Sequence, residues 1–356
     1  MTTISASVAS FLVACTMLFV LRPFAEVIGL VDKPGGRKTH HGEVPVVGGI
    51  AMFSGLVIAA VGGEGLGHGG LSLLVVAAFM VFIGALDDRF NLPPGVRLFA
   101  HLSSAFALVY ATRFSVPSLG DLFSLGQINL GIFAVPFTVI ATVALINAFN
   151  MLDGLDGLAG TVGMVAFGGV MFIAARVDAV SLLLVAGSMF GAILAFLLFN
   201  FPVQFNRPFR TFMGDAGSTL LGFVLAGLGL TLVQPKPISL SPIVILWLMP
   251  IPIFELFTST IRRLVKGMPP MQADSGHFHH VLVKAGFSVR AICAIYLLVS
   301  ATCCSLGVWA SGHPDVSDSV LFAGFVAIFA IWLAFIRASD RLVAYLPVWL
   351  RRVDAS

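Results

Sequence analysis

Long apolar segments separated by short polar loops constrain this chain more than any other feature of its sequence. A helix needs about 20 mostly apolar residues to cross a bilayer. Eleven segments approach that length and composition: 4–27, 46–63, 70–86, 97–112, 132–149, 158–176, 179–201, 216–233, 239–260, 288–310 and 319–337. Charged residues make up only 10% of the 356 residues, whereas soluble domains carry about 25%. We therefore expect an all-α integral membrane protein with about eleven transmembrane helices, forming one domain over residues 1–356.

The distribution of Lys and Arg over the loops predicts the orientation of these helices. If the first loop faces the cytoplasm and the spans alternate, 17 of the 20 Lys and Arg lie on the cytoplasmic side. Basic residues gather in the cytoplasmic loops of membrane proteins. The pattern predicts an N-terminus outside the cytoplasm, on the periplasmic side, and a cytoplasmic C-terminus. A net charge of only +3 without a basic tract excludes a nucleic-acid partner.

Polar motifs also gather at the predicted cytoplasmic helix ends. They lie in the loops near 31–46, 87–97, 147–158, 201–216 and 261–288. Transporters more often place ionisable groups near the bilayer midplane, so a transporter is a distant alternative. The arrangement favours an enzyme whose active site faces the cytoplasm.

Adjacent carboxylates end one of the apolar segments, in "GALDDRFNLPPGVRL". Asp87 and Asp88 repel each other, and partial burial increases the repulsion. A nearby cation is therefore expected, either an Arg or a divalent metal ion. The simpler interpretation is a solvated helix end paired with Arg89.

A second polar motif, "NAFNMLDGLDGLAG", repeats this pattern. Asn147, Asn150, Asp153 and Asp156 follow at intervals of three, which would place them on one side of a helix. The glycines allow a ligand or a backbone to come close. The alternative is a polar loop in which an Asp caps the next helix.

Three further motifs supply groups suited to phosphate. In "RTFMGDAGSTLLGF", Asp215 precedes a long apolar helix, either as a Mg²⁺ ligand beside phosphate oxygens or simply as the N-cap. The stretch "ADSGHFHHVL" carries His277, His279 and His280, and "KPGGRKTHHGEVPVVGG" carries Lys38. Basic groups of this kind bind a metal or a diphosphate, or merely satisfy the positive-inside rule. Together the motifs predict metal-assisted phosphoryl transfer, with Mg²⁺ or alternatively Mn²⁺ as cofactor.

Four of these motifs, "LDDRFNLPPGVRL", "NAFNMLDGLDGLAG", "FMGDAGSTLLGF" and "HFHHVL" in this order, resemble those of the polyprenyl-phosphate N-acetylhexosamine-1-phosphate transferase family. Within it, "HFHH" and "KPGGRKTHHGEVPVVGGIA" resemble the WecA-type branch. The resemblance implies transfer of N-acetylglucosamine 1-phosphate from UDP-GlcNAc to undecaprenyl phosphate in the membrane, with release of UMP. The expected setting is the first membrane step of O-antigen-type polysaccharide synthesis. The oligomeric state stays open, a homodimer included.

The resemblance also implies a role for each matching residue. Asp87 and Asp88 match the catalytic aspartates, one acting as base on the lipid phosphate and the other, Asp88, also helping to hold metal. Asp215 matches the Mg²⁺ ligand. The expected substrate-binding residues are Asn150, Asp153, Asp156, His277, His279, His280, Lys38 and Arg97.

Three departures from the family pattern concern the site. Ser275 replaces an Arg common before the histidines, so one phosphate contact of the family is not expected here. Asn91 stands where relatives often have a third Asp, so this position is expected to tune the site without acting as base. Glu255 stands where many relatives have Asp, and its simplest role is an ion pair with Arg262 or Arg263. A different UDP-N-acetylhexosamine, of the GalNAc, FucNAc or QuiNAc type, is the main alternative donor.

Overall fold

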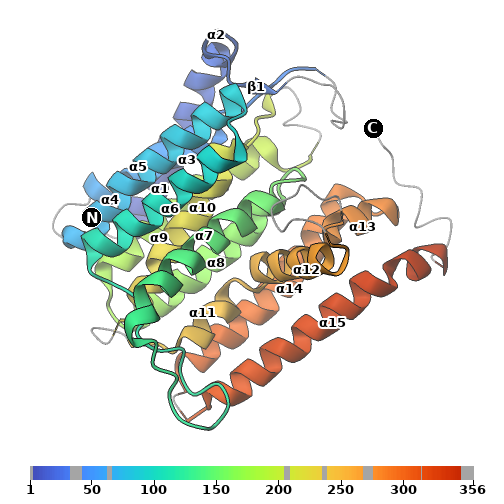
Figure 1. Cartoon of the computed structure of the whole chain (residues 1–356). Coiled ribbons are helices and arrows are strands. Elements are labelled where there is room, and N and C mark those ends of the chain that lie inside the picture. Colours follow the sequence, from blue (N-terminus) through green and yellow to red (C-terminus); the bar gives the residue numbers. More distant parts are fainter. Residues whose placement is uncertain are drawn as a thin grey trace.

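The computed structural model shows a bundle of long helices that run broadly side by side (Figure 1). The structure describes residues 3–32, 42–61, 66–203, 209–234, 239–267, 276–313 and 315–345. The helices of the N-terminal half are α1 (Thr3–Leu21), η1 (Arg22–Phe24), α2 (Ala25–Ile28), α3 (Gly48–Leu56), α4 (Ile58–Val61), α5 (Gly67–Phe90), α6 (Pro94–Thr112), η2 (Gly131–Phe133), α7 (Ala134–Leu152) and α8 (Leu158–Arg176). Those of the C-terminal half are α9 (Val180–Asn200), α10 (Gly214–Leu232), α11 (Pro242–Leu248), α12 (Pro250–Val265), α13 (Phe278–Lys284), α14 (Val289–Ala310) and α15 (Asp318–Tyr345).

The expectation of an all-α membrane protein is confirmed. Within the described residues, eight helices are long and apolar enough to cross a bilayer, or nine if α11 and α12 form one broken span. Helices occupy all eleven expected segments, but two of these do not meet that test. The apolar helix over 48–60 is too short, and α6 is not among the candidate spans. The count of eleven and the orientation therefore stay predictions.

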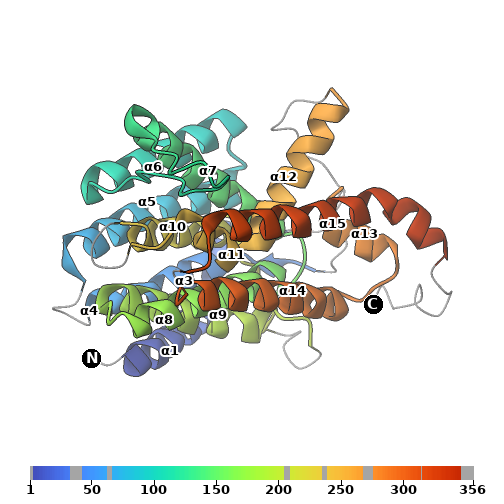
Figure 2. The same cartoon turned by 90° about the horizontal axis from the view of Figure 1, so that it is seen from below.

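The expected continuous helix over 239–260 is wrong. The chain bends by 92° between α11 and α12, and Figure 2 shows α12 turning away from the direction of the long helices. Met249 at the break has φ −137° and ψ 52°. Because Pro250 follows, helical backbone at Met249 would clash with the proline ring, and a second proline at Pro252 adds to the constraint.

The central helix of the bundle is α10, because 83% of the residues in its apolar 18-residue stretch are buried. Small residues let its neighbours approach closely. A Cβ atom on Gly84 of α5 would lie 2.4 Å from the Cα of Ala216, and one on Gly49 of α3 would lie 2.2 Å from the amide nitrogen of Gly217. Such close backbone packing is typical of membrane helices. It fixes the first turn of α10 between α3 and α5.

Backbone hydrogen bonds hold the segment before α10 in place. The two-residue strands β1 (Val31–Asp32) and β2 (Val44–Pro45) pair antiparallel. The amide of Phe212 donates to the carbonyl of Pro45, and the amide of Gly48 donates to the carbonyl of Phe212. At the opposite end of the bundle, residues 118–129 form a short hairpin, in which Ser118 and Asn129 pair antiparallel.

Candidate active site

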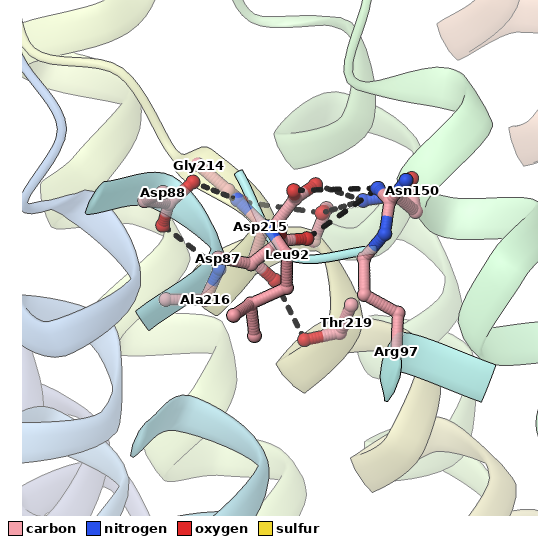
Figure 3. Close-up of polar contacts among 10 residues, drawn as sticks. Asp87, Asp88, Leu92, Arg97, Asn150, Gly214, Asp215, Ala216 and Thr219 are labelled. Atoms are coloured by element: carbon pink, nitrogen blue, oxygen red, sulfur yellow. Dashed lines mark hydrogen bonds and ion pairs between the residues drawn. The ribbon is translucent and has the colours of Figure 1, made fainter. Parts of the chain in front are cut away.

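Three helix ends meet at one polar cluster, as Figure 3 shows. The C-terminal end of α5 contributes Asp87 and Asp88, the last turns of α7 contribute Asn150, and the first turn of α10 contributes Asp215. Arg97, in the first turn of α6, reaches the same cluster. The sequence-predicted residues from four separate segments are therefore brought together.

Asp88 caps the N-terminus of α10 from a different helix. Its Oδ1 accepts the N–H of Asp215 at 2.7 Å, and its Oδ2 accepts the N–H of Ala216 at 3.2 Å. The N-cap position itself is Met213, which makes no side-chain cap. The alternative in which Asp215 is the N-cap is therefore wrong. The first amides of a helix lack intrahelical acceptors and carry partial positive charge, which suits a carboxylate.

Gly214 makes this capping geometry accessible. Its φ of +70° lies in the left-handed region, and a Cβ atom there would lie 2.5 Å from Oδ2 of Asp88. Any larger residue would both strain the backbone and displace the carboxylate.

Asp87 is buried and engaged on both oxygens. Oδ1 accepts the N–H of Leu92 at 2.7 Å, while Oδ2 lies 3.4 Å from a guanidinium nitrogen of Arg97. The same nitrogen lies 4.0 Å from Asp215, so Arg97 bridges the two carboxylates. The Asp87 side chain is 3% exposed and that of Asp215 is 31% exposed. Asp215 is thus the carboxylate open to an incoming ligand, and Arg97 covers Asp87.

Asn150 links α7 to α10. Its amide nitrogen donates to Oδ1 of Asp215 and to Oγ of Ser218, the latter at 3.1 Å. Asn147 instead donates to the carbonyl of Val143 in its own helix at 2.8 Å. The expected ladder of side chains at intervals of three therefore includes Asn150 but not Asn147.

Asp153 and Asp156 do not share a helix side with Asn150, and the alternative of a polar loop between two helices holds here. Leu152 is the last residue of α7, and Asp153 and Asp156 lie in the turn before α8. Burial, together with the charges of Asp215 and Asp156, raises the pKa of Asp153 to about 8. Asp156 forms an ion pair with Arg210. Asp153 therefore holds a proton at neutral pH when no cation is bound beside it.

Asn200, which the sequence analysis did not select, fixes this turn. Its amide oxygen accepts the N–H of Gly157 at 2.6 Å, and its amide nitrogen donates to the carbonyl of Thr211 at 2.9 Å. The side chain thereby joins the α7–α8 turn to the segment before α10. A single buried Asn at the end of an apolar helix was the signal available in the sequence.

The histidine motif packs against the same turn. A Cβ atom on Gly154 would lie 2.7 Å from Nε2 of His279. Burial lowers the pKa of His279 to about 3, although the Glu255 carboxylate opposes that shift. His279 is therefore neutral at physiological pH and supplies no positive charge. His280 is partly exposed, with its ring centroid 4.3 Å from that of His279.

Glu255 does not make the predicted ion pair with Arg262 or Arg263. Its carboxylate contacts His277 at 3.2 Å and the hydroxyl of Tyr296 at 2.5 Å. The bend before α12 explains the error, because it turns Glu255 towards α13 and α14. The sequence alone showed no reason to expect that direction.

Another residue missed by the sequence analysis is His101, one helical turn after Arg97. It is 7% exposed, its Nδ1 has no hydrogen-bond partner, and it interacts electrostatically with Asp215 and Arg97. The i, i+4 spacing from Arg97 was the signal that would have found it. Lys38 lies outside the described residues.

The donor set suits a hard divalent cation that also binds substrate. Among the described residues, no group of three or more Asp, Glu, His or Cys side chains is placed to hold a metal ion. Mg²⁺, however, is usually bound by one or two carboxylates together with substrate phosphates and water. The partly exposed Asp215, with the buried Asp87 or the partly buried Asp153 as a second carboxylate, meets that requirement. Both Asp88 oxygens already accept amides.

Comparison with known proteins shows the family of this chain. A family model described as glycosyl transferase family 4 matches residues 70–233, which include Asp87, Asn150 and Asp215. The undecaprenyl-phosphate alpha-N-acetylglucosaminyl 1-phosphate transferase of Yersinia pestis is 34% identical over 344 residues, covering 96% of this chain and 94% of the relative. The protein of that name from Salmonella typhi is 35% identical, and the match covers 99% of this chain and 96% of the relative. The one from Haemophilus influenzae is 33% identical, and the match covers 97% of this chain and 96% of the relative.

Fold and site together define a polytopic membrane enzyme whose polar groups gather at the ends of the central helices. The chain belongs to glycosyl transferase family 4, whose members related to it here are sugar-1-phosphate transferases. The resemblance inferred from the four sequence motifs is thereby confirmed.

Proposed function

We propose that this protein transfers N-acetylglucosamine 1-phosphate from UDP-GlcNAc to undecaprenyl phosphate at the cytoplasmic face of a bacterial inner membrane. The observation that carries the proposal is the convergence of Asp87, Arg97, Asn150 and Asp215 from the ends of four helices, α5, α6, α7 and α10. The names of the relatives supply the donor and acceptor classes. O-antigen-type polysaccharide synthesis is the pathway we propose for the product.

Arg97 is placed to receive the lipid phosphate. Its side chain is 35% exposed while it covers Asp87. A phosphate oxygen competes well for a guanidinium, because the paired N–H groups match phosphate geometry. Binding of undecaprenyl phosphate would therefore draw Arg97 away from Asp87 and free that carboxylate as it meets the acceptor.

The proposed chemical step is a direct displacement. Asp87 takes the remaining proton of the lipid phosphate, and the phosphate oxygen attacks the sugar-bearing phosphorus of UDP-GlcNAc. The bond from that phosphorus to the bridging oxygen breaks, UMP leaves, and undecaprenyl-diphosphate GlcNAc forms. Asp87 is suited to this task because Leu92 fixes one oxygen and leaves the other towards Arg97.

We also propose that Mg²⁺, or Mn²⁺ in its place, binds at Asp215 with support from Asp87 or Asp153. Bound there, the ion would neutralise the negative charge of the diphosphate. Asn150 orients Asp215 through its amide, and Ser218 orients Asn150. Asp88 contributes by holding the start of α10, which carries Asp215, in position.

A radiolabelled transfer assay tests the function. Purified protein in detergent is incubated with labelled UDP-GlcNAc and undecaprenyl phosphate, and both lipid-linked label and UMP are measured, with and without Mg²⁺. UDP-GalNAc and the UDP-linked FucNAc and QuiNAc donors form parallel arms. We expect product only with UDP-GlcNAc and Mg²⁺. UMP release with another donor alone would overturn the choice of sugar, and no transfer by folded protein with any donor would overturn the function.

A further inference from the structure

A buried carboxylate organises the histidine motif. Glu255, in α12, is 1% exposed. Its Oε2 accepts the backbone N–H of Phe278 at 3.3 Å and lies 3.2 Å from Nδ1 of His277. Its Oε1 accepts the hydroxyl of Tyr296 at 2.5 Å and lies 3.9 Å from Nδ1 of His279. One carboxylate therefore contacts α13 and α14 at four points.

These contacts orient the two imidazole rings. A carboxylate accepts hydrogen bonds, so the proton of His277 is on the Nδ1 that faces Glu255. The His277 and His279 rings are parallel, with an interplanar angle of 1° and centroids 5.5 Å apart. His279 turns Nδ1 towards Glu255 and Nε2 towards Gly154, and neither nitrogen has a hydrogen-bond partner. A buried Nε2 without a hydrogen-bond partner therefore lies next to the turn that carries Asp153.

The residue between the two histidines anchors the motif from the other side. Phe278 is 6% exposed and packs on Trp332 and Tyr296, with ring centroids 4.3 and 5.9 Å apart. The packing explains the His-Phe-His order of residues 277–279, because Phe278 enters the aromatic core while the flanking histidines face Glu255. Aromatic packing fixes the backbone, and the carboxylate fixes the ring rotamers.

We propose that Glu255 is a positioning residue of the transfer reaction, which sets the orientation and protonated nitrogen of His277 and His279 so that His279 presents Nε2 towards Gly154. The inference rests on the proposed function, since it assigns the histidine motif to the transfer site. A carboxylate in so apolar a place is costly to desolvate, and packing alone would be served by an apolar side chain. Partners that orient a histidine in this way commonly change metal affinity or activity by 10- to 100-fold in metal sites.

Three variants separate positioning from packing. Glu255→Gln keeps the volume but places an amide N–H₂ against either His277 or Tyr296. Glu255→Asp keeps the charge on a shorter side chain. Tyr296→Phe removes one hydrogen bond to the same carboxylate and leaves the aromatic packing intact, so it serves as the matched control.

Turnover, KM and thermal midpoint are measured for each variant in detergent. We expect Glu255→Gln to lower kcat by about 10- to 100-fold, Glu255→Asp to recover part of that loss, and Tyr296→Phe to stay within about threefold of the wild type. The thermal midpoints of Glu255→Gln and Tyr296→Phe should fall by similar amounts. Equal losses of kcat in these two variants would overturn the inference, because a purely structural role predicts that result.

NMR of protein labelled with ¹⁵N in the histidine rings gives a readout that does not need activity. Signals of His277 and His279 are assigned by His277→Gln and His279→Gln among the eight histidines. The wild type should show protonated Nδ1 and unprotonated Nε2 at both rings, and Glu255→Gln should change that pattern. An unchanged pattern would overturn the inference. If the wild type transfers no sugar phosphate, the proposed function fails while this experiment still decides the role of Glu255.

Discussion

Separate replacement of Asp87 and Asp88 by Asn should distinguish an effect on turnover from an effect on stability. Asp88→Asn keeps one of the two acceptors that Asp88 offers to the amides of Asp215 and Ala216 and turns the other into a donor. A hydrogen bond to a charged group contributes about 1.5–3 kcal/mol, so the start of α10 should lose about that much stability. Asp87→Asn keeps the acceptor for Leu92. It weakens the contact with Arg97 but also removes a charge that repels Asp215, so its net loss of stability should be smaller.

Both variants should nevertheless lose at least about 100-fold in turnover, Asp87→Asn through the missing base and Asp88→Asn through displaced Asp215. Unfolding in detergent, followed by tryptophan fluorescence, and the radiolabelled transfer assay measure the two effects. Arg89→Gln is the control, because Arg89 is exposed and its guanidinium lies over the ring of Phe90. Equal thermal midpoints for the two Asn variants, or a less stable Asp87→Asn, would refute this division of roles.

Further predictions concern the metal, the pH dependence and the far end of the bundle. Asp215→Asn should lose at least about 100-fold in turnover, and EDTA should abolish transfer until Mg²⁺ or Mn²⁺ is added back; activity in EDTA would contradict the metal proposal. The pKa of Asp153 is raised to about 8 from about 3.9 in an unfolded chain, so between these values the native state holds the extra proton. Metal-free protein should therefore lose stability as pH rises from 4 towards 8, and Asp153→Asn should flatten that thermal-midpoint profile. Asp318→Asn removes an acceptor for the amide of Asp121 at the opposite end and should leave transfer activity unchanged in the same assay.

The polar motifs were predictable from sequence because each depends on residue type and local position. Charged residues in an apolar chain must border water or a partner, which restricted them to helix ends before any coordinates were known. The cluster of Asp87, Asn150 and Asp215 follows from that restriction, combined with helices that all end near one surface. The sequence thus predicted which segments meet, although the catalytic and ligand-binding roles of their residues stay predictions.

The partner that each side chain of the cluster contacts was not predictable, because these contacts join segments distant in sequence. Asp88 caps a helix that begins 126 residues later, at Gly214, and no local pattern distinguishes such a cap from a metal ligand. Asn91, where relatives often have Asp, ends α5 with φ at +50°. Asn tolerates this left-handed conformation better than most residues, so the departure has a backbone explanation.

The broken span links these observations. Had residues 239–260 formed one straight helix, Glu255 would have continued along the bundle axis, and an ion pair with Arg262 or Arg263 one or two turns later would have been reasonable. The proline-imposed bend at Met249 instead turns α12 by 92° from α11, and Glu255 meets His277 and Tyr296. Straightening the bend with Pro250→Ala and Pro252→Ala should therefore displace the histidine motif, and the His277 ring signals should lose the protonated Nδ1 seen with Glu255. If those signals stay unchanged, the bend is not what brings Glu255 to the histidines.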